Sequence, residues 1–232
     1  TGATSAGKHL LQASPRYPAG TQWAGNFDPI TSLGATDWVN YQVSVDVMLM
    51  APMPEYAKDD PMVPMPTEDG VLTDWTPDPI SGGVYGGVCV RQIDQYSSGF
   101  CLLVGVGLVK GGPDGEMAVS EKGWVLQAGA MHMARSPGTA LDSGSLPESF
   151  SLEEYHRLTL RVQGQELTVT IDGKLVATVT NSASSIPPAG QAALRSSFTY
   201  TQFDNLVIDG PDHGSKSEQA HLVQAYILHQ HS

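Results

Sequence analysis

The sequence predicts an all-β protein that folds as one antiparallel sandwich or barrel. Apolar and polar residues alternate over many short stretches, and turn residues separate these stretches at short intervals. Helical segments do not alternate with them, which argues against a βαβ fold. The composition agrees, because Gly (25) and Pro (16) are frequent among the 232 residues and only 16% of the residues are charged. Roughly nine to eleven strands are expected from this pattern.

The first regular strand is expected within residues 39–50, where every second residue from Tyr41 to Leu49 is aromatic or aliphatic. Trp38 immediately precedes this strand and is expected in the core. The next segment, 51–83, contains seven of the 16 prolines together with several acidic residues, so it cannot run inside a sheet. We interpret it as a long surface insertion, either functional or an irregular excursion without a role.

A central hairpin is expected from two apolar stretches, 84–93 and 99–108, on either side of the polar turn 94–98. Both stretches are apolar at nearly every position, which indicates burial on both faces. Cys89 and Cys101 lie at equal distances from the turn and should face each other. A cross-strand disulfide is geometrically feasible if they form a non-hydrogen-bonded pair. The alternative is two reduced cysteines packed in the core.

The second half of the chain gives the clearest strand pattern. Three alternating stretches, 156–164, 166–172 and 174–180, include the turn Asp172–Gly173, and this dipeptide is the strongest short signal for a β-hairpin. The remaining predictions for this half are strands at 124–126, 191–195 and 198–209, a turn at 110–116 and a polar loop at 136–149.

These elements are expected to form one domain, residues 1–210, followed by a tail, residues 211–232. In the tail, Ser215 and Glu218 have the spacing of a capping box, and the apolar residues after them cluster on one helical face. A short docking helix is therefore favoured over disorder for the tail.

The charge of the chain excludes two classes of partner. It contains 24 Asp and Glu against 12 Lys and Arg, a net charge of −12, with a pI near 4.8. Phosphate backbones and anionic membranes would repel such a chain, so nucleic-acid binding is not expected. No apolar stretch approaches the ~20 residues that span a bilayer, so the chain is not expected to be transmembrane. Its first residues lack the layout of a signal peptide.

Catalytic signatures are absent from the sequence. We find no nucleophile elbow, zinc-protease motif, phosphate-binding glycine loop or cysteine pair at metal spacing. Glycoside hydrolysis needs two carboxyl groups about 5 to 10 Å apart, but the adjacent Glu153 and Glu154 would face opposite ways in an extended segment. Four of the seven histidines lie in the tail, and His156 is interpreted as a packed surface residue that starts a strand. No catalytic residue is therefore assigned to this chain.

Aromatic residues on an acidic, polar scaffold are better candidates for function. Sugar rings offer C–H faces to Trp and Tyr, and sugar hydroxyls bind polar side chains. Trp23 lies in a Gly- and Pro-rich stretch and Trp75 in the proline-rich insertion, so exposure is expected for both.

Four segments show a resemblance that goes beyond periodicity. In chain order they are GTQWAGNFDPITSLGATDWVNYQVSVDV (20–47), GGVYGGVCVR (82–91), EEYHRLTLRVQG (153–164) and FTYTQFDNLVID (198–209). Over roughly residues 8–209 the chain resembles the C-terminal lectin-like domain of the galactocerebrosidase family, lysosomal β-galactosidases that act on galactosylceramide. The resemblance implies a concanavalin-like jelly-roll sandwich packed on a TIM-barrel catalytic domain. That barrel holds both catalytic glutamates, and this chain lacks it.

The resemblance also implies a calcium site and a substrate contact. Asp204 matches the family's calcium-binding aspartate, and Lys8 matches the residue that gives a backbone carbonyl. Trp23 matches a tryptophan that reaches over the substrate pocket. Calcium needs more oxygen ligands than these residues supply, so a partner chain or further residues would complete the shell. The alternative for Asp204 is a turn or strand-edge carboxylate bonded to backbone amides.

The resemblance therefore predicts a non-catalytic lectin-like chain of a galactocerebrosidase-like glycosidase, located in the lysosome or outside the cell. Its expected partners are a catalytic TIM-barrel chain of the same enzyme and a carbohydrate or glycolipid, with calcium as the cofactor. The alternative is a free-standing carbohydrate-binding module, or an extracellular structural or interaction protein, built on the same sandwich.

Overall fold

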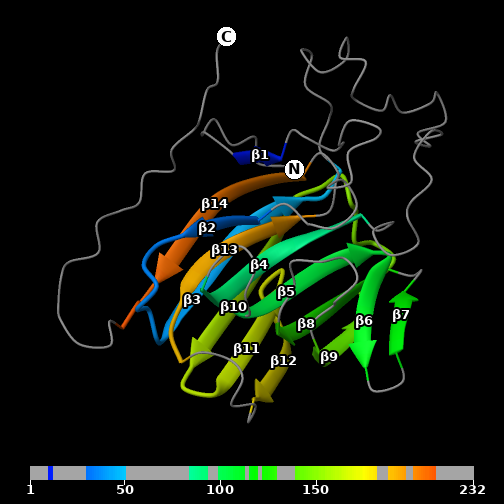
Figure 1. Ribbon diagram of the computed structural model, residues 1–232. Helices are drawn as coiled ribbons and strands as arrows, with labels where there is room; N and C mark the ends of the chain where they lie inside the picture. Colours follow the sequence, from blue (N-terminus) through cyan, green and yellow to red (C-terminus); the bar gives the residue numbers. More distant parts are fainter. Residues whose placement is uncertain are drawn as a thin grey trace, which may run out of the picture.

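The chain folds as a β-sandwich of two sheets in its computed structural model (Figure 1). The structure describes residues 10–12, 30–50, 84–93, 99–112, 115–119, 122–129, 139–181, 188–196 and 201–212. These residues form fourteen strands and no helix. The strands are β1 (Leu10–Gln12), β2 (Ile30–Leu33), β3 (Tyr41–Met48), β4 (Val84–Gln92), β5 (Gly99–Val106), β6 (Leu108–Gly112), β7 (Gly115–Val119), β8 (Gly123–Gly129), β9 (Thr139–Ser145), β10 (His156–Gln163), β11 (Glu166–Ile171), β12 (Lys174–Thr180), β13 (Gln191–Ser196) and β14 (Thr201–Asp209). The predicted all-β sandwich is confirmed.

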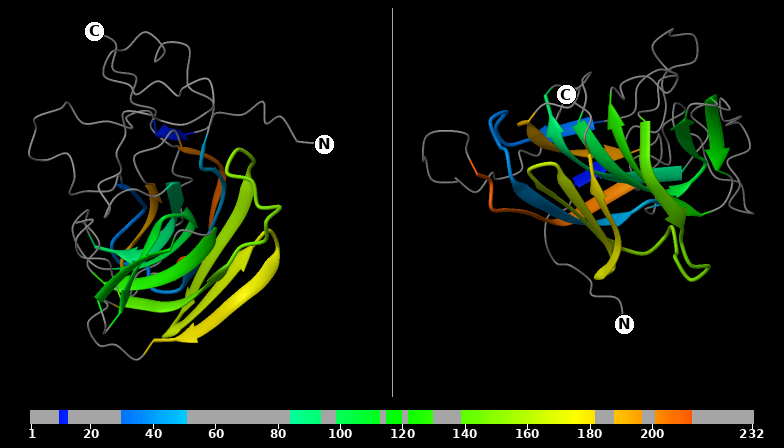
Figure 2. Two further views of the ribbon diagram at one scale, coloured as in Figure 1. Left: turned by 90° about the vertical axis from the view of Figure 1, so that its right-hand side faces the viewer. Right: turned by 90° about the horizontal axis from the view of Figure 1, so that it is seen from below.

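The two sheets lie face to face, and the left view of Figure 2 shows them as separate layers. The first sheet has six strands in the order β1-β14-β3-β10-β11-β12, and the second has eight in the order β2-β13-β4-β5-β8-β9-β6-β7. Among the described strands, every pairing is antiparallel except a single parallel contact between β6 and β9. β3 and β14 are neighbours in the six-stranded sheet, whereas β4 to β9 and β13, which lie between them in the chain, belong to the other sheet. The chain therefore crosses from one sheet to the other and back, as in a jelly roll.

Aliphatic and aromatic side chains fill the space between the sheets. On β3, alternate residues from Tyr41 to Val47 point into this space and are almost completely buried, and Leu49 continues the row. Trp38 is also buried and contacts Tyr41 edge to face, with ring centroids 5.5 Å apart. Gly34 lies against the Trp38 ring, with a φ of 86° and no room for a Cβ atom. The core positions predicted in this region are therefore confirmed.

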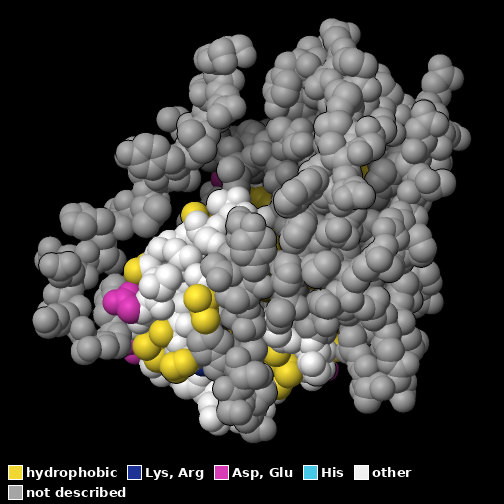
Figure 3. All heavy atoms as spheres, in the orientation of Figure 1, with side chains coloured by type: hydrophobic (Ala, Val, Ile, Leu, Met, Phe, Trp, Pro, Cys, Tyr) yellow, Lys and Arg dark blue, Asp and Glu magenta, His cyan; other side chains and the backbone are white. Residues whose placement is uncertain are grey.

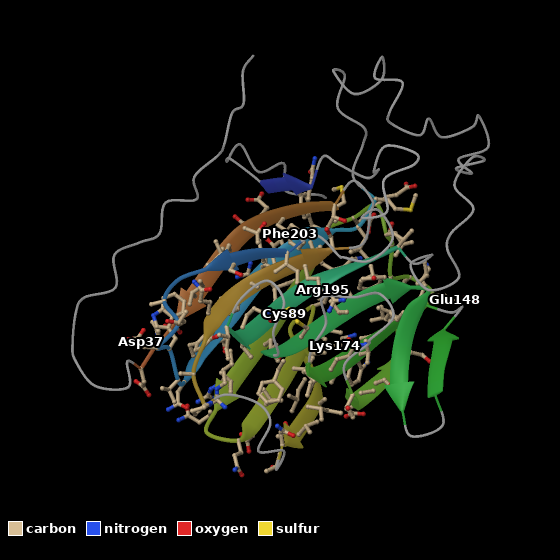
Figure 4. All side chains as sticks on the ribbon, viewed as in Figure 1. Asp37, Cys89, Glu148, Lys174, Arg195 and Phe203 are labelled. Atoms are coloured by element: carbon tan, nitrogen blue, oxygen red, sulfur yellow. A yellow bond between two sulfur atoms is a disulfide. The ribbon has the colours of Figure 1, made fainter. Side chains whose placement is uncertain are left out.

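The central hairpin of the eight-stranded sheet, β4 and β5, is buried on both faces as predicted. Its inner side chains join the main core, and its outer side chains form a second apolar cluster with neighbouring strands. Cys89 lies directly opposite Cys101, and the two form a disulfide in this outer cluster; Figure 4 labels Cys89. Of the two alternatives that the sequence left open, the structure has the disulfide.

The turn between β11 and β12 has the geometry that an Asp-Gly pair favours. Asp172 and Gly173 both adopt positive φ, 49° and 75°, as a type I′ turn requires. The predicted hairpin is confirmed. The same turn brings the Asp172 carboxylate to the start of β10, where it accepts a hydrogen bond from the Arg157 N–H at 2.9 Å.

One stretch predicted to be a loop contains a strand, so this prediction was wrong, and one predicted turn was given bounds that are too wide. Residues 136–149, predicted to be a polar loop, contain β9, which pairs with β8. Residues 110–116, predicted to be one turn, contain the facing ends of β6 and β7. Both stretches are rich in glycine or small polar residues, and pairing with a neighbouring strand overrides their weak strand propensity. On β9, Gly144 leaves room for the indole of Trp124 on the neighbouring strand.

Some predicted features lie outside the described residues, namely the insertion at 51–83 and the greater part of the tail, 213–232. Within the described ranges, no helix is long and apolar enough to cross a membrane.

Apolar side chains on the described surface are scattered. Figure 3 shows small, separate groups of them among polar and backbone atoms on the face that it presents. The exposed large hydrophobic residues are Met50, Ile93, Leu175 and Val207. Met50 and Ile93 lie just beyond the ends of β3 and β4, and the other two lie on β12 and β14. Single exposed apolar residues are normal on protein surfaces. Polar clusters are therefore the better place to look for a functional site among the described residues.

Candidate metal centre

Asp204 is the one predicted site residue that the structure describes. It lies on β14, between the edge strand β1 and the inner strand β3. Trp23 and Lys8 fall outside the described residues, so their predicted roles stay predictions.

Strand alternation places Asp204 on the outer face of the six-stranded sheet. The preceding residue, Phe203, points into the core, and Figure 4 labels it on β14. Asp204 points the opposite way, yet only 7% of its surface is exposed. An ionised carboxylate is costly to bury unless polar partners or a cation compensate for the lost water. The Asn205 N–H supplies one such partner to Asp204.

A second carboxylate lies beside it. Asp46 on β3 is the direct cross-strand neighbour of Asp204. Side chains at opposite positions point to the same face, with Cβ atoms about 4.5 to 5.5 Å apart, and like charges in this arrangement are destabilising. The sheet thus concentrates negative charge at one place on its outer face.

Arg157 on β10 compensates for one of these two charges. Its Nη1 donates to Asp46 Oδ1 at 3.0 Å and to the backbone carbonyl of Asn205 at 2.7 Å. Asn205 Nδ2 donates to Asp46 Oδ2 at 2.7 Å. Both oxygens of Asp46 therefore have a hydrogen-bond donor, one of them cationic.

The chain bulges immediately after Asp204. The register between β14 and β3 shifts between Asp204 and Val207, and Asn205 adopts a left-handed φ of 48°. Asn is one of the few residues that tolerate this conformation. The Asn205 N–H then donates to Asp204 Oδ1 at 2.7 Å. This bond is also expected if Asp204 is a strand-edge carboxylate without a metal, which is the alternative that the sequence left open. The bond alone therefore does not identify a cation site.

Tyr155 borders the two carboxylates. Its hydroxyl donates to Gln202 Oε1 at 2.8 Å. Burial raises the pKa of the Tyr155 hydroxyl, and the negative charges of Asp204 and Asp46 raise it further. The hydroxyl thus stays protonated beside this acidic area.

Calcium takes several carboxylate and carbonyl oxygens, and of the two carboxylates here Asp46 already has a hydrogen-bond donor on each oxygen. In the register of β1 on β14, Leu10 lies opposite Phe203, so the N-terminal end of β1 reaches the neighbourhood of Asp204. Within the described part of the chain, no group of three or more His, Cys, Asp and Glu residues could hold a metal ion. Further ligands would have to come from backbone carbonyls, from water or from a partner chain.

A separate polar cluster surrounds His156, which is buried and not the surface residue that the sequence predicted. Its Nδ1 lies 2.8 Å from Asp172 Oδ2, its Nε2 lies 2.8 Å from the Ser151 carbonyl, and its ring stacks on Phe150 with centroids 3.6 Å apart. The prediction failed because Asp172 and Phe150 approach His156 only when the hairpin and the preceding loop fold over it. We assign this cluster a structural role, since it ties the loop to the hairpin turn.

Sequence reasoning found Asp204 but missed the residues around it. Asp46, Tyr155 and Arg157 lie within segments of the family resemblance, but nothing in their sequence context assigned them to a site. The signal that could have found Asp46 is the pairing of β3 with β14, which places it opposite Asp204.

The chain is thus a β-sandwich protein with two facing sheets. The family model described as "Galactocerebrosidase, C-terminal lectin domain" matches residues 114–211. The resemblance seen in the sequence is therefore confirmed over this part of the chain, which contains Asp204.

Solved structures with a similar arrangement include a carbohydrate-binding module, CBM66, from Bacillus subtilis. It is 11% identical, with a TM-score of 0.49, and the likeness covers 84% of this chain and 92% of that one. Sheep galectin-11, in complex with glycerol, is 11% identical with a TM-score of 0.40, over 78% of this chain and 97% of that one. A Bacillus subtilis protein of unknown function with a galectin-like fold is 11% identical with a TM-score of 0.42, over 77% and 76% of the two chains. No curated protein matches the sequence.

Proposed function

We propose that this chain is the non-catalytic, lectin-like part of a galactocerebrosidase-like glycosidase and that it contributes to the recognition of galactosides or glycolipids. The family match at residues 114–211 is the observation that supports this proposal best. The two catalytic glutamates would belong to a TIM-barrel partner chain of the same enzyme, as the resemblance implies.

The disulfide supports a location in the lysosome or outside the cell. Cys89 and Cys101 are bonded across β4 and β5. Disulfides persist in oxidising compartments and are rare in the cytosol. A protein that passes through the secretory route would meet such an oxidising compartment.

Calcium is the proposed structural cofactor. Asp204 would give a carboxylate oxygen, and Lys8, two residues before β1 in the chain, would give its backbone carbonyl. A bound calcium ion would offset the negative charge of Asp204, which no arginine or lysine compensates among the contacts described above.

Removing calcium should lower the melting temperature of the wild-type chain, and Asp204→Ala should abolish this response. A ligand that binds only the folded state stabilises it by about 2.7 kcal/mol at a hundredfold excess over its dissociation constant. Thermal melting with calcium and with a chelator, for both proteins, measures the effect. Asp209→Ala is the matched control, because Asp209 is an exposed carboxylate on the same strand. An Asp204→Ala variant that still responds to the chelator like the wild type would exclude this site.

Trp23 is proposed to contact the sugar or lipid. Removing this contact tests the proposed role in galactoside or glycolipid recognition. Trp23→Ala should leave stability within about 0.5 kcal/mol of the wild type while affinity for galactose-bearing ligands falls. The control is Trp38→Ala, where loss of a buried indole should cost about 3 to 5 kcal/mol. Urea unfolding gives the stabilities, and titration of the ligand into the chain reconstituted with the catalytic chain gives the affinity.

Two outcomes would count against this assignment. A large loss of stability in Trp23→Ala would place the residue in the core, and unchanged stability with unchanged affinity would leave it without a role in binding. Equal affinity of the wild-type chain with and without the catalytic chain would favour a free-standing carbohydrate-binding module.

A further inference from the structure

β12 is an open edge of the six-stranded sheet. It is the last strand in the order of that sheet, and the left view of Figure 2 shows it, in yellow, at the border of its layer. Among the described strands, only β11 pairs with it. With seven residues it is also the longest of the four edge strands, since β1 has three, β2 four and β7 five. A long edge strand presents a row of backbone groups to which another strand can bind.

The hydrogen bonds to β11 show which backbone groups of β12 point to the open side. The Asn181 N–H, directly after β12, donates to the Gln165 carbonyl at 2.9 Å, on the side of β11. Successive residues of a strand direct their backbone groups to opposite sides, so those of Val179 also point to β11. The N–H and C=O groups of Thr178 and Thr180 then point away from β11. These four groups have no strand partner in the described part of the chain.

Few of the features that usually protect an edge strand occur in β12. Both of its outward-pointing threonines are exposed, and Leu175 has 66% of its surface exposed. Proteins protect sheet edges with prolines, charged residues and bulges. β12 contains no proline, and its one charged residue, Lys174, is at its first position. The register shift against β11 places an extra residue at Val176, so residues 177–180 form the regular part that is available for pairing.

We propose that β12 pairs with β12 of a second copy of this chain, antiparallel and about a twofold axis at Val179. In this register Thr178 of one copy lies opposite Thr180 of the other, and all four outward-pointing backbone groups of each copy gain a partner. Side chains of the same face meet, because Val179, which packs against the core, lies opposite its own counterpart. The two six-stranded sheets would become one continuous sheet. This inference does not rest on the proposed function.

The distribution of charge favours a second copy as the occupant of this edge. The chain has a net charge of −12, so two copies repel each other where acidic surfaces meet. The sequence has no Asp or Glu between Asp172 and Asp204, a stretch that includes β12. The nearest acidic neighbour of the regular part is Glu166, which lies opposite Thr180 on β11. In the proposed register this row continues into uncharged threonines of the second copy, so like charges do not face each other.

Analytical ultracentrifugation of the full chain at concentrations up to about 1 mM tests the proposal. The wild type should change from one chain to two as the concentration rises. Thr178→Pro removes one N–H donor from each copy, and proline is tolerated at the edge of a sheet. We expect the dissociation constant of the dimer to rise at least about tenfold.

Thr178→Glu is a second variant, which keeps the backbone donor and so guards against misfolding of the proline variant. It places a carboxylate in the same row as Glu166 of the second copy, on both sides of the axis, and should weaken the dimer at least about threefold. Thr168→Glu is the matched control, because Thr168 lies directly opposite Thr178 on β11, on the same face but away from the edge. This control should associate within about twofold of the wild type.

Hydrogen exchange measured by NMR locates the contact. Exchange at the Thr178 and Thr180 amides should become slower as the concentration of the chain rises, because these groups gain hydrogen bonds only in the dimer. Exchange at the Val179 amide, which points to β11 within one chain, should not follow the dimer fraction in this way.

Each of four results would overturn the proposal. The first is a wild type that stays a single chain up to about 1 mM, and the second is a dimer whose formation leaves Thr178 exchange unchanged. The third is equal weakening by Thr168→Glu and Thr178→Glu, which would place the contact on the face of the sheet. The fourth is slower exchange at Thr178 and Thr180 only after the catalytic chain is added, since that chain would then occupy the edge. Concentration-dependent dimers that Thr178→Pro and Thr178→Glu weaken, with slower exchange at Thr178 and Thr180, would support it.

Discussion

Replacing both cysteines of the Cys89–Cys101 disulfide with alanine should lower the free energy of unfolding by about 3 kcal/mol. The bond closes a loop with a sequence separation of 12 residues, and it lies in a sheet that is buried on both faces. Without the bond, the unfolded chain regains the conformational freedom that the closed loop had removed. Urea unfolding of the double variant and the oxidised wild type measures the difference.

Alanine also leaves space where the two buried sulfur atoms were, so a control is needed. Reduced wild-type protein keeps this volume and lacks only the bond. We expect it to lose most of the stability that the double variant loses, with the remainder due to the cavity. Equal midpoints for oxidised and reduced wild type would contradict the prediction.

Strands could be predicted from the sequence where the residues of a single segment alternate between apolar and polar or contain a turn signal. The alternation from Tyr41 to Leu49 predicted a buried face on β3, and the Asp172–Gly173 pair predicted the hairpin of β11 and β12, because both signals are local. Where glycine and small polar residues dominate, as in β9 and the β6–β7 hairpin, no local pattern exists. Those strands form because a neighbouring strand offers them hydrogen bonds, which is information outside the segment itself.

The residues of the candidate site were even harder to predict from local sequence patterns. Asp204 was found through the QFDN segment of the family resemblance. Its supporting contacts join residues that are far apart in the chain: Arg157 and Asp46 are 111 positions apart, and Asn205 and Asp46 are 159 apart. Contacts over such separations depend on the order and register of β10, β3 and β14. Periodicity fixes neither, so the network could not be predicted from the residues alone.

The polar contacts of Tyr41 could not be predicted from the apolar pattern of β3. The alternation on β3 marked it correctly as a core position, but its hydroxyl is the centre of a buried polar cluster. The Arg91 N–H donates to Tyr41 Oη at 2.6 Å, and the hydroxyl donates to the carbonyls of Gly190 and Gln191, each at 2.9 Å. These contacts join β3, β4 and the start of β13, and so they connect the two sheets.

Tyr41→Phe should therefore lower the free energy of unfolding by about 2 kcal/mol, within the range of about 1 to 3 kcal/mol expected when a buried polar group loses its partner. The substitution keeps the ring and its contact with Trp38 but leaves the buried Arg91 N–H without this acceptor. Burial raises the pKa of the Tyr41 hydroxyl above its usual range, which indicates that water has little access to compensate. The midpoint of urea unfolding measures the loss.

Tyr155→Phe is the matched control for this prediction, because it removes the same atom from a less buried position. The Tyr155 hydroxyl donates to the side chain of Gln202, which is partly exposed and can turn to water instead. Its loss should cost less than about 1 kcal/mol. If the two variants lose stability equally, burial of the Tyr41 cluster does not set its energy, and the role of Tyr41 in joining the sheets is wrong. A clearly larger loss in Tyr41→Phe would show that the buried hydroxyl, and not the ring alone, holds β4 and β13 against β3.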